Sequence, residues 1–543
     1  MSLKTAASLA VVVFASSLAC APATAADPAA DAPQRAACDA LKFADFTRVP
    51  DAPAKVMESA YVEATRDVPA ACLARGYVAP QVGFEMKLPA GGWNGKLLTL
   101  GSGGFTGSTQ VEAEQAWCDD AVRRGYACIH SDYGHTGGVG PKSLASLDGL
   151  WAYNNLPAEI DYAYRGIHVV AAVEKAIARQ FYGSVQKKSY FMGCSNGGRQ
   201  AMVAAQRYPA DFDGVVAMEP AMDLSGAFVN FLYNYRAVTD AQGKPLFTPD
   251  ELQLLKKGAV AKCDLDDGLA DGVISNPRAC AFDPGTLACG SSQAQGAGQC
   301  LSPLQVAAAR KVYAGAVDSS GRHLYRGRVM PGGETGSFGF AVTRPLAQYM
   351  LFDFFRYLAF LPDAGPDWKP ADFDFDRDPR RLASMEQLYH ATNPDLRDFK
   401  EAGGKLIIVQ GWEDAGTPFP LNTIDYYETM QRTMGGQKAT QDFARLFMFP
   451  GRSHCAGGDG ANSADFLAAL ENWSERGRAP DMLKASHVVS TNAVDYLREA
   501  DPALVKFTRP VYPYPLMARY KGSGDPNDYR SFKAVPLPEP KNP

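Results

Sequence analysis

A glycine-rich turn between a strand-like and a helix-like segment restricts the fold of this chain more than any other feature. The turn spans residues 193–198 and reads Gly-Cys-Ser-Asn-Gly-Gly; the apolar run 189–192 precedes it and the helix-like run 199–205 follows it. In a nucleophile elbow, a Gly-x-Ser-x-Gly turn in this setting raises one serine hydroxyl above a sheet, because small residues allow a sharp backbone turn. We therefore expect Ser195 to be a nucleophile.

A serine nucleophile needs a base that accepts its proton, and the base needs an orienting acid. In α/β-hydrolases the order along the chain is serine, then acid, then histidine. Of the seven histidines, the four that follow Ser195 are His323, His390, His454 and His487. Only His454 comes directly after a strand-like run (444–449) and a glycine-containing turn. We expect His454 to be the base.

The acid is expected after another core strand. The run 405–410 is apolar enough for a buried strand, and it leads into Gly411-Trp412-Glu413-Asp414. Two carboxylates are adjacent here, so the residues alone leave Glu413 and Asp414 both open. We favour Asp414 as the functional acid and interpret Glu413 as a turn residue on a solvated loop.

Two cysteines flank the predicted nucleophile and base. Cys194 directly precedes Ser195, and Cys455 directly follows His454. If the serine and the histidine meet at hydrogen-bond distance, their neighbours come close enough for a disulfide. The alternative is two buried free thiols. We favour the disulfide, because both cysteines adjoin predicted triad residues.

These residues resemble the mark of the tannase and feruloyl esterase family, a Cys-Ser, Asp, His-Cys arrangement. It stands here as Cys194-Ser195, Asp414 and His454-Cys455. The resemblance covers nearly all of the mature chain and includes Trp93-Asn94-Gly95, the glycine loop after it, residues 132–135 and residues 518–525. It implies that Asp414, rather than Glu413, is the acid.

The order of segments agrees with the fold that this family implies. Strand-like and helix-like segments alternate from about residue 80 to 220, which favours a largely parallel α/β sheet. The next comparable strand is 405–410, so the segment between reads as an inserted lid. We expect an α/β-hydrolase fold with a large inserted lid domain: a signal peptide at 1–25, hydrolase parts at 26–220 and 401–543, and the lid at 221–400.

The amino-terminal segment predicts export. It has Lys4, an apolar core at 9–14 and the small-residue site Ala23-Thr24-Ala25, which together are typical of a secretory signal peptide. We expect a secreted or periplasmic protein. No later run reaches the ~18 apolar residues of a membrane span. The net charge of −5 gives no polyanion-binding signature, so nucleic acid is not an expected partner.

The cysteine count fits an oxidising compartment. Of eleven cysteines, Cys20 leaves with the signal peptide, and the remaining ten are an even number. Local spacing and the family resemblance suggest three pairs besides Cys194 with Cys455: Cys38 with Cys72, Cys263 with Cys280, and Cys289 with Cys300. Cys118 and Cys128 remain as the fifth pair by elimination.

Ester hydrolysis also needs N–H donors for the negative charge that develops on the carbonyl oxygen. The elbow supplies one donor, the backbone N–H of Asn196. A second donor is expected from the glycine-rich loop 101–107, which follows the strand-like run 97–100. The family resemblance places Gly104 at the donor position.

An acidic loop in the predicted lid indicates a cation. Asp264, Asp266, Asp267 and Asp271 bring four carboxylates into eight residues. Oxygen ligands favour Ca²⁺, although the loop is not an EF-hand, because Ser275 stands where a bidentate glutamate is needed. The resemblance implies a structural Ca²⁺ held by five residues, with Asp266 facing solvent and no organic cofactor. These five are Asp264, Asp267, Leu269, Asp271 and Val273.

Together these features predict a secreted serine carboxylesterase. Its expected substrates are small aromatic esters of the hydroxycinnamate (feruloyl) or gallate type, including those linked to plant polysaccharide or tannin. Most aromatics of the run 346–360 are expected in the lid core, and the rest could line an acyl pocket. One alternative is a hydrolase of terephthalate monoesters or other aromatic half-esters. The other is a non-catalytic phenolic- or carbohydrate-binding protein on a hydrolase scaffold.

Overall fold

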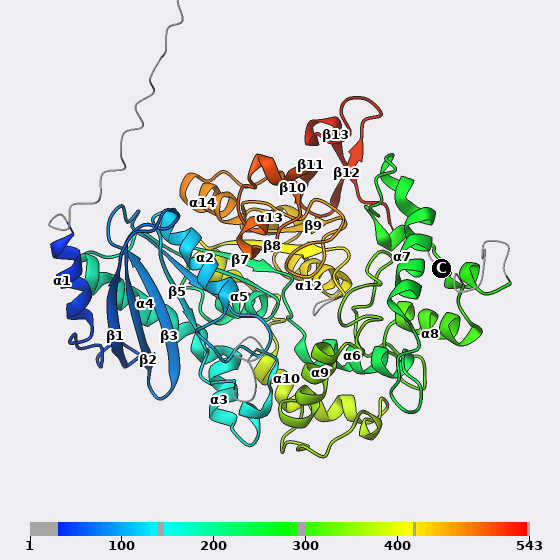
Figure 1. The fold of residues 1–543 in the computed structure, drawn as a ribbon, viewed down its shortest axis with the longest axis horizontal. Coiled ribbons are helices and arrows are strands. Elements are labelled where there is room, and N and C mark those ends of the chain that lie inside the picture. Colours follow the sequence, from blue (N-terminus) through cyan, green and yellow to red (C-terminus); the bar gives the residue numbers. More distant parts are fainter. Residues whose placement is uncertain (1–30, 138–145, 291–299, 416–419, 540–543) are drawn as a thin grey trace, which may run out of the picture.

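The computed structural model describes residues 31–137, 146–290, 300–415 and 420–539. The predicted signal peptide, 1–25, lies outside the described residues. A nine-stranded sheet crosses the molecule in the order β1-β2-β3-β5-β4-β6-β7-β8-β9 (Figure 1). Its strands are β1 (Ala54–Val62), β2 (Ala71–Val78), β3 (Val82–Pro89), β4 (Lys96–Leu100), β5 (Ala127–Ser131), β6 (Lys188–Cys194), β7 (Gly214–Met218), β8 (Lys405–Gly411) and β9 (Ala444–Phe449).

The larger part of this sheet is parallel. The pairs from β5 through β4, β6, β7 and β8 to β9 are all parallel, whereas β1, β2, β3 and β5 pair antiparallel. The sheet and the crossover helices confirm the predicted α/β class. The antiparallel strands β1 and β2 were not predicted from the sequence.

Helices cover both faces of the parallel strands. Along β6 to β9, alternate residues enter two different hydrophobic clusters, as the two-residue repeat of a strand requires. One cluster contains residues of α2 (Glu112–Arg123) and α14 (Phe466–Arg476). The other contains residues of α4 (Gly166–Tyr182), α5 (Asn196–Arg207) and α12 (Pro420–Thr433). Burial on both faces explains why these strands read as continuous apolar runs.

Between β7 and β8 the described chain is helical and adds no strand to this sheet. Most of its buried apolar residues share one large core, which extends to Phe105 and Tyr162 of the first hydrolase part. Most apolar residues of α9 lie in this core, as predicted for the aromatic run. The α-helices of this segment are α6 (Leu224–Ala237), α7 (Pro249–Cys263), α8 (Pro303–Ala314), α9 (Pro345–Tyr357), α10 (Ala383–Tyr389) and α11 (Arg397–Glu401).

The remaining elements are short. The carboxy-terminal part forms two small antiparallel sheets, β10 with β11 and β12 with β13, which were not predicted. Among the described residues, no helix combines the length and the apolar character that crossing a membrane requires. The elements are α1 (Ala32–Leu41), α3 (Leu156–Ile160), α13 (Gln437–Gln441), β10 (Leu483–Val488), β11 (Val505–Val511), β12 (Leu516–Tyr520) and β13 (Phe532–Pro536).

Candidate active site

Ser195 occupies a strained turn between β6 and α5. Its backbone has φ 64° and ψ −121°, a conformation that non-glycine residues rarely adopt and that is expected of a nucleophile elbow. The glycines around it allow close backbone contacts. A Cβ on Gly197 would lie 2.7 Å from the backbone of Gly101, and one on Gly193 would lie 2.5 Å from the Gly197 carbonyl oxygen. The glycine pattern is therefore a steric requirement of the turn.

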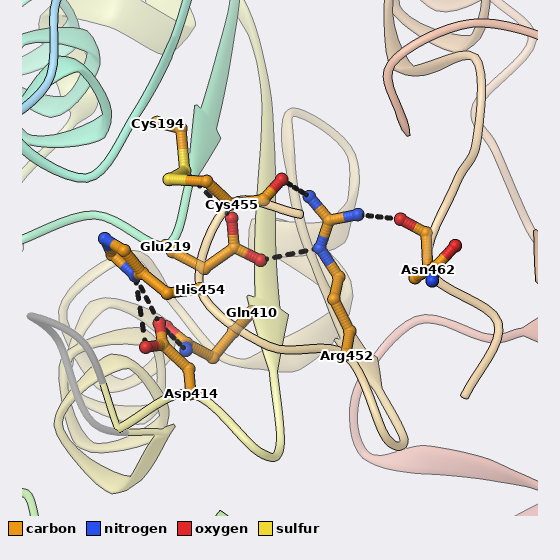
Figure 2. Close-up of a disulfide and its surroundings, with 8 residues drawn as sticks. All are labelled: Cys194, Glu219, Gln410, Asp414, Arg452, His454, Cys455 and Asn462. Atoms are coloured by element: carbon orange, nitrogen blue, oxygen red, sulfur yellow. Dashed lines mark hydrogen bonds and ion pairs between the residues drawn. A yellow bond between two sulfur atoms is a disulfide. The ribbon is translucent and has the colours of Figure 1, made fainter. Parts of the chain in front are cut away.

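His454 and Asp414 meet at the same edge of the sheet as Ser195. Asp414 follows β8, His454 follows β9, and Nδ1 of the imidazole lies 3.1 Å from each carboxylate oxygen of Asp414 (Figure 2). Asp414 is buried, and Nε2 of Gln410 donates to it at 3.1 Å. The carboxylate can therefore fix the ring orientation and the tautomer with a proton on Nδ1.

The surroundings of His454 favour its protonated form. Burial opposes protonation, but the carboxylates of Asp414 and Glu219 together outweigh it and raise the pKa of His454 above its ordinary value. The side chain keeps 30% of its surface exposed, so a substrate can reach it. An imidazole with these properties suits a base that becomes transiently charged.

All five expected disulfides are present. Cys194 and Cys455 are joined although they lie 261 residues apart, so one bond ties the turn of Ser195 to the loop of His454. The other pairs are Cys38 with Cys72, Cys118 with Cys128, Cys263 with Cys280, and Cys289 with Cys300.

The two expected oxyanion donors lie on neighbouring segments. Asn196 is the first residue of α5, and its side chain donates to the carbonyl oxygen of Ser102 at 3.1 Å. This bond attaches the loop 101–107 to the elbow. Gly104 has a left-handed φ of 58°, and a Cβ there would lie 2.2 Å from the Ser146 carbonyl oxygen, so the position requires glycine.

Glu413 differs from its sequence-based interpretation. It is buried rather than placed on a solvated loop, and its carboxylate lies 2.8 Å from Nζ of Lys256. Burial raises the pKa of Glu413 to about 7, with Lys256 opposing the rise. The sequence gave no signal for this pair, because Lys256 belongs to α7, 157 residues away.

A second buried pair was also missed. Glu219 directly follows β7, Arg452 lies two residues before His454, and their side chains meet at 2.8 Å with no exposed surface. A charged residue immediately after a buried strand was the one available signal for Glu219. Both residues contact the disulfide region of the site (Figure 2).

The acidic loop has the oxygen donors that Ca²⁺ prefers, held in part by the protein itself. Asp264 accepts backbone N–H bonds from Asp271, Gly272 and Val273, and Arg509 pairs with Asp271 at 2.7 Å. Asp266 is exposed, as expected.

The carboxylates of this loop are not drawn together around one point. Among the described residues, the single trio of metal-type side chains whose ligand atoms lie within 4.8 Å of one another is Cys194, Glu219 and Cys455. Two of these three are disulfide-bonded and unsuitable as ligands. The donor types of the acidic loop thus fit calcium, and binding would need the loop aspartates to move closer together.

Comparison with known proteins gives a consistent result. The family model described as tannase and feruloyl esterase matches residues 65–535. A mono(2-hydroxyethyl) terephthalate hydrolase of Piscinibacter sakaiensis is 34% identical over 93% of this chain and 92% of its own length. A probable feruloyl esterase B-2 of Aspergillus flavus is 30% identical over 75% of this chain and 77% of its own.

The solved structures agree. The crystal structure of feruloyl esterase B from Aspergillus oryzae superposes with a TM-score of 0.78 and 26% identity, over 92% of this chain and all of that one. The match establishes the α/β-hydrolase fold for the sheet and helices described above. The chain belongs to the tannase and feruloyl esterase family and is a carboxylic ester hydrolase.

Proposed function

We propose that the protein hydrolyses aromatic carboxylic esters by a serine mechanism in which Ser195, His454 and Asp414 form the catalytic triad. His454 takes the proton of the Ser195 hydroxyl as that oxygen attacks the ester carbonyl, and then gives it to the leaving alcohol. Asp414 holds the imidazole in the required tautomer. The N–H groups of Asn196 and Gly104 stabilise the oxyanion, and water then releases the acid from the acyl-enzyme.

One observation carries this proposal. Nδ1 of His454 faces the buried carboxylate of Asp414 at 3.1 Å, while the disulfide from Cys455 to Cys194 ties that histidine to the turn of Ser195. Such a bond limits the relative movement of a nucleophile and a base that must stay at hydrogen-bond distance. A non-catalytic binding protein would have no use for a strained serine, a buried acid and this link at one edge of a sheet.

Hydroxycinnamate (feruloyl) or gallate esters are the proposed substrates, since the family model and the Aspergillus relatives are named for feruloyl esterases and tannase. A terephthalate-monoester activity is the second candidate. It is supported by the Piscinibacter sakaiensis relative, which is 34% identical over nearly the whole chain. Free aromatic acids are the expected products in either case.

The place of action is proposed to be outside the cytoplasm, in the periplasm or the medium. Five disulfides connect described parts of the chain, which is typical of proteins that fold in oxidising compartments. The expected leader at 1–25 agrees with this compartment.

A structural calcium ion is proposed for the acidic loop at the end of α7. The carboxylates of Asp264, Asp267 and Asp271 would hold it with the carbonyl oxygens of Leu269 and Val273. Such an ion would add rigidity to the loop and takes no part in the ester chemistry.

The proposal is tested with a panel of methyl ferulate, methyl caffeate, methyl gallate, chlorogenate and mono(2-hydroxyethyl) terephthalate. We expect the highest kcat/KM on a hydroxycinnamate or gallate ester, and a fall to near background in Ser195→Ala. The double variant Ser195→Ala with His454→Ala should be scarcely slower than either single variant, because triad members act as a unit. Full activity in Ser195→Ala, or strictly additive losses, would refute the triad.

A further inference from the structure

A buried ion pair, Glu219 with Arg452, contacts both cysteines of the disulfide between Cys194 and Cys455. Oε1 of Glu219 lies 2.8 Å from Nε of Arg452, and neither side chain has exposed surface. Replacing such a pair with apolar groups of similar size is often neutral or stabilising, so stability is a weak reason for its presence here. The position of the pair beside His454 suggests a functional reason.

Glu219 is fixed on both its backbone and its side chain. Its φ of 39° is unusual for a residue with a side chain, and its N–H donates to the carbonyl oxygen of Val409 at 2.8 Å. Its second carboxylate oxygen, Oε2, lies 3.2 Å from Sγ of Cys194. A disulfide sulfur has no proton to donate to this oxygen. Burial raises the pKa of Glu219 above its ordinary value, and the guanidinium of Arg452 opposes that rise and favours the charged carboxylate.

Arg452 links Glu219 to the loop that carries His454. Besides Glu219, its guanidinium donates to the carbonyl oxygen of Cys455 at 2.7 Å and to that of Asn462. The arginine therefore connects the loop of His454 to the carboxylate after β7. In Figure 2 the carboxylate of Glu219 lies between the guanidinium of Arg452 and the imidazole of His454.

We propose that Glu219 is a positioning residue for the ester hydrolysis. Its bond to Arg452 fixes the carboxylate in place, and this carboxylate gives His454 a second fixed negative charge besides that of Asp414. The inference rests on the proposed triad. Each half-reaction passes through a charged imidazolium, formed when a proton moves from the Ser195 hydroxyl, or later from water, to Nε2 of His454. A fixed anion stabilises this charge without rearranging, and Glu219 does so without touching the substrate.

The charges that face His454 determine the direction in which its pKa should change when Glu219 is replaced. Asp414 after β8 and Glu219 after β7 raise the pKa of His454, whereas Arg452 on its own loop lowers it; Glu219 has the larger effect of the last two. Removing the charge of Glu219 therefore lowers the pKa of His454. The base then stays unprotonated down to lower pH, while the imidazolium of the transition state loses stabilisation.

The test is the pH profile of kcat/KM for Glu219→Gln, measured with p-nitrophenyl butyrate at the isosbestic wavelength of the product. We expect the acidic limb to move down by about one pH unit and kcat on the plateau to fall about tenfold. KM should change little, because Glu219 does not touch the substrate. A purely structural role would lower kcat without moving the limb.

A second variant covers the risk that Glu219→Gln leaves Arg452 unpaired and prevents folding. In Glu219→Gln with Arg452→Gln both charges are absent, so the pKa of His454 should lie between those of the wild type and the single variant. An NMR titration of the His454 imidazole measures its pKa in the three proteins directly, without relying on enzyme activity. If only the double variant folds, a pKa below that of the wild type supports the proposal.

Glu413→Gln is the matched control, because Glu413 is another buried carboxylate near the triad, but its partner is Lys256. The acidic limb should stay in place in this variant. An unchanged limb in Glu219→Gln and in the double variant, or an equal shift in Glu413→Gln, would overturn the inference. Failure of the triad itself is distinguishable, since Ser195→Ala would then keep the wild-type rate.

Discussion

Nζ of Lys256 lies 2.8 Å from the carboxylate of Glu413, which joins α7 to the loop that carries Asp414. The same ammonium group lies 2.7 Å from Asp459, a residue of the chain after His454. One lysine of the inserted segment is therefore bonded to both the loop of Asp414 and the loop of His454. Lys256 also neutralises the buried carboxylate of Glu413.

Lys256→Met should destabilise the protein, and more so at alkaline pH. Removing one partner of a buried pair typically costs about 3–5 kcal/mol, because the other charge remains buried. The pKa of Glu413 is already raised to about 7, so the stability that Glu413 costs accumulates as pH rises from the unfolded pKa to about 7 and then stays constant. Without Lys256 this pKa rises further, and the loss of stability extends to higher pH.

Urea unfolding at pH 5.5 and pH 8.5 measures this difference. The loss of unfolding free energy in Lys256→Met should be clearly larger at pH 8.5. Lys257→Met is the control, since Lys257 is exposed on the same helix and should cost less than about 0.5 kcal/mol at both values. Equal losses at the two pH values would contradict the prediction.

Two adjacent glycines of the expected oxyanion loop should respond differently to alanine. At Gly104 a Cβ would lie 2.2 Å from the Ser146 carbonyl oxygen in a left-handed backbone conformation, whereas at Gly103 the space is open within 4 Å. We expect Gly104→Ala to lower kcat by about 10²-fold, as the loss of an oxyanion donor does. Gly103→Ala should stay within a few-fold of the wild type, and a comparable loss there would refute the argument.

The parts of this structure that were predictable are those encoded in a short stretch of chain. The elbow, the strands β8 and β9 and the loops after them show their character within a short stretch of sequence, and the family resemblance chose Asp414 for the proposed triad. The ion pairs were not predictable, because their partners are far apart in sequence; Glu219 and Arg452, for example, lie 233 residues apart. Charged residues next to a catalytic loop are read as solvated unless a distant partner is known, which is how Glu413 was misinterpreted.

The strands β1 and β2, at one end of the sheet, were missed for a related reason. The strands β1 and β2 alternate less regularly between buried and exposed residues than a half-buried strand should. In the folded chain β2 pairs with both β1 and β3, and the disulfide from Cys38 to Cys72 joins it to α1. Tertiary contacts decide strand formation where the local signal is weak.

Calcium should stabilise the protein without acting in catalysis. An ion that binds only the folded loop contributes about 2.7 kcal/mol at a concentration one hundred times its dissociation constant. We expect long dialysis against EDTA to lower Tm, and added Ca²⁺ to restore it. Asp267→Asn should abolish the response, whereas Asp266→Asn, on an exposed neighbour outside the expected ligand set, should keep it. An identical Tm with and without EDTA, together with no calcium in elemental analysis, would contradict the site.

Removing the disulfide between Cys194 and Cys455 should harm both stability and rate. It closes a loop of 261 residues, for which the chain-entropy model gives roughly 5.5 kcal/mol, although measured values are often lower. Its neighbours in sequence are the proposed nucleophile and the proposed base, and small misplacement of reacting groups can cost about 10²-fold in rate. With both cysteines replaced by alanine, kcat should therefore fall more than KM rises, at a temperature where the variant is still folded.

The pair Cys118 with Cys128 is a matched control for this experiment. It joins α2 to β5 across only 10 residues, and the same model gives roughly 3 kcal/mol for such a loop. Replacing both of these cysteines with alanine should lower Tm and leave kcat of the folded enzyme nearly unchanged, because neither cysteine adjoins a triad residue. If both double variants lose stability but keep the wild-type kcat, the bond between Cys194 and Cys455 serves folding alone. A fall in kcat confined to the variant lacking that bond would instead tie it to the geometry of Ser195 and His454.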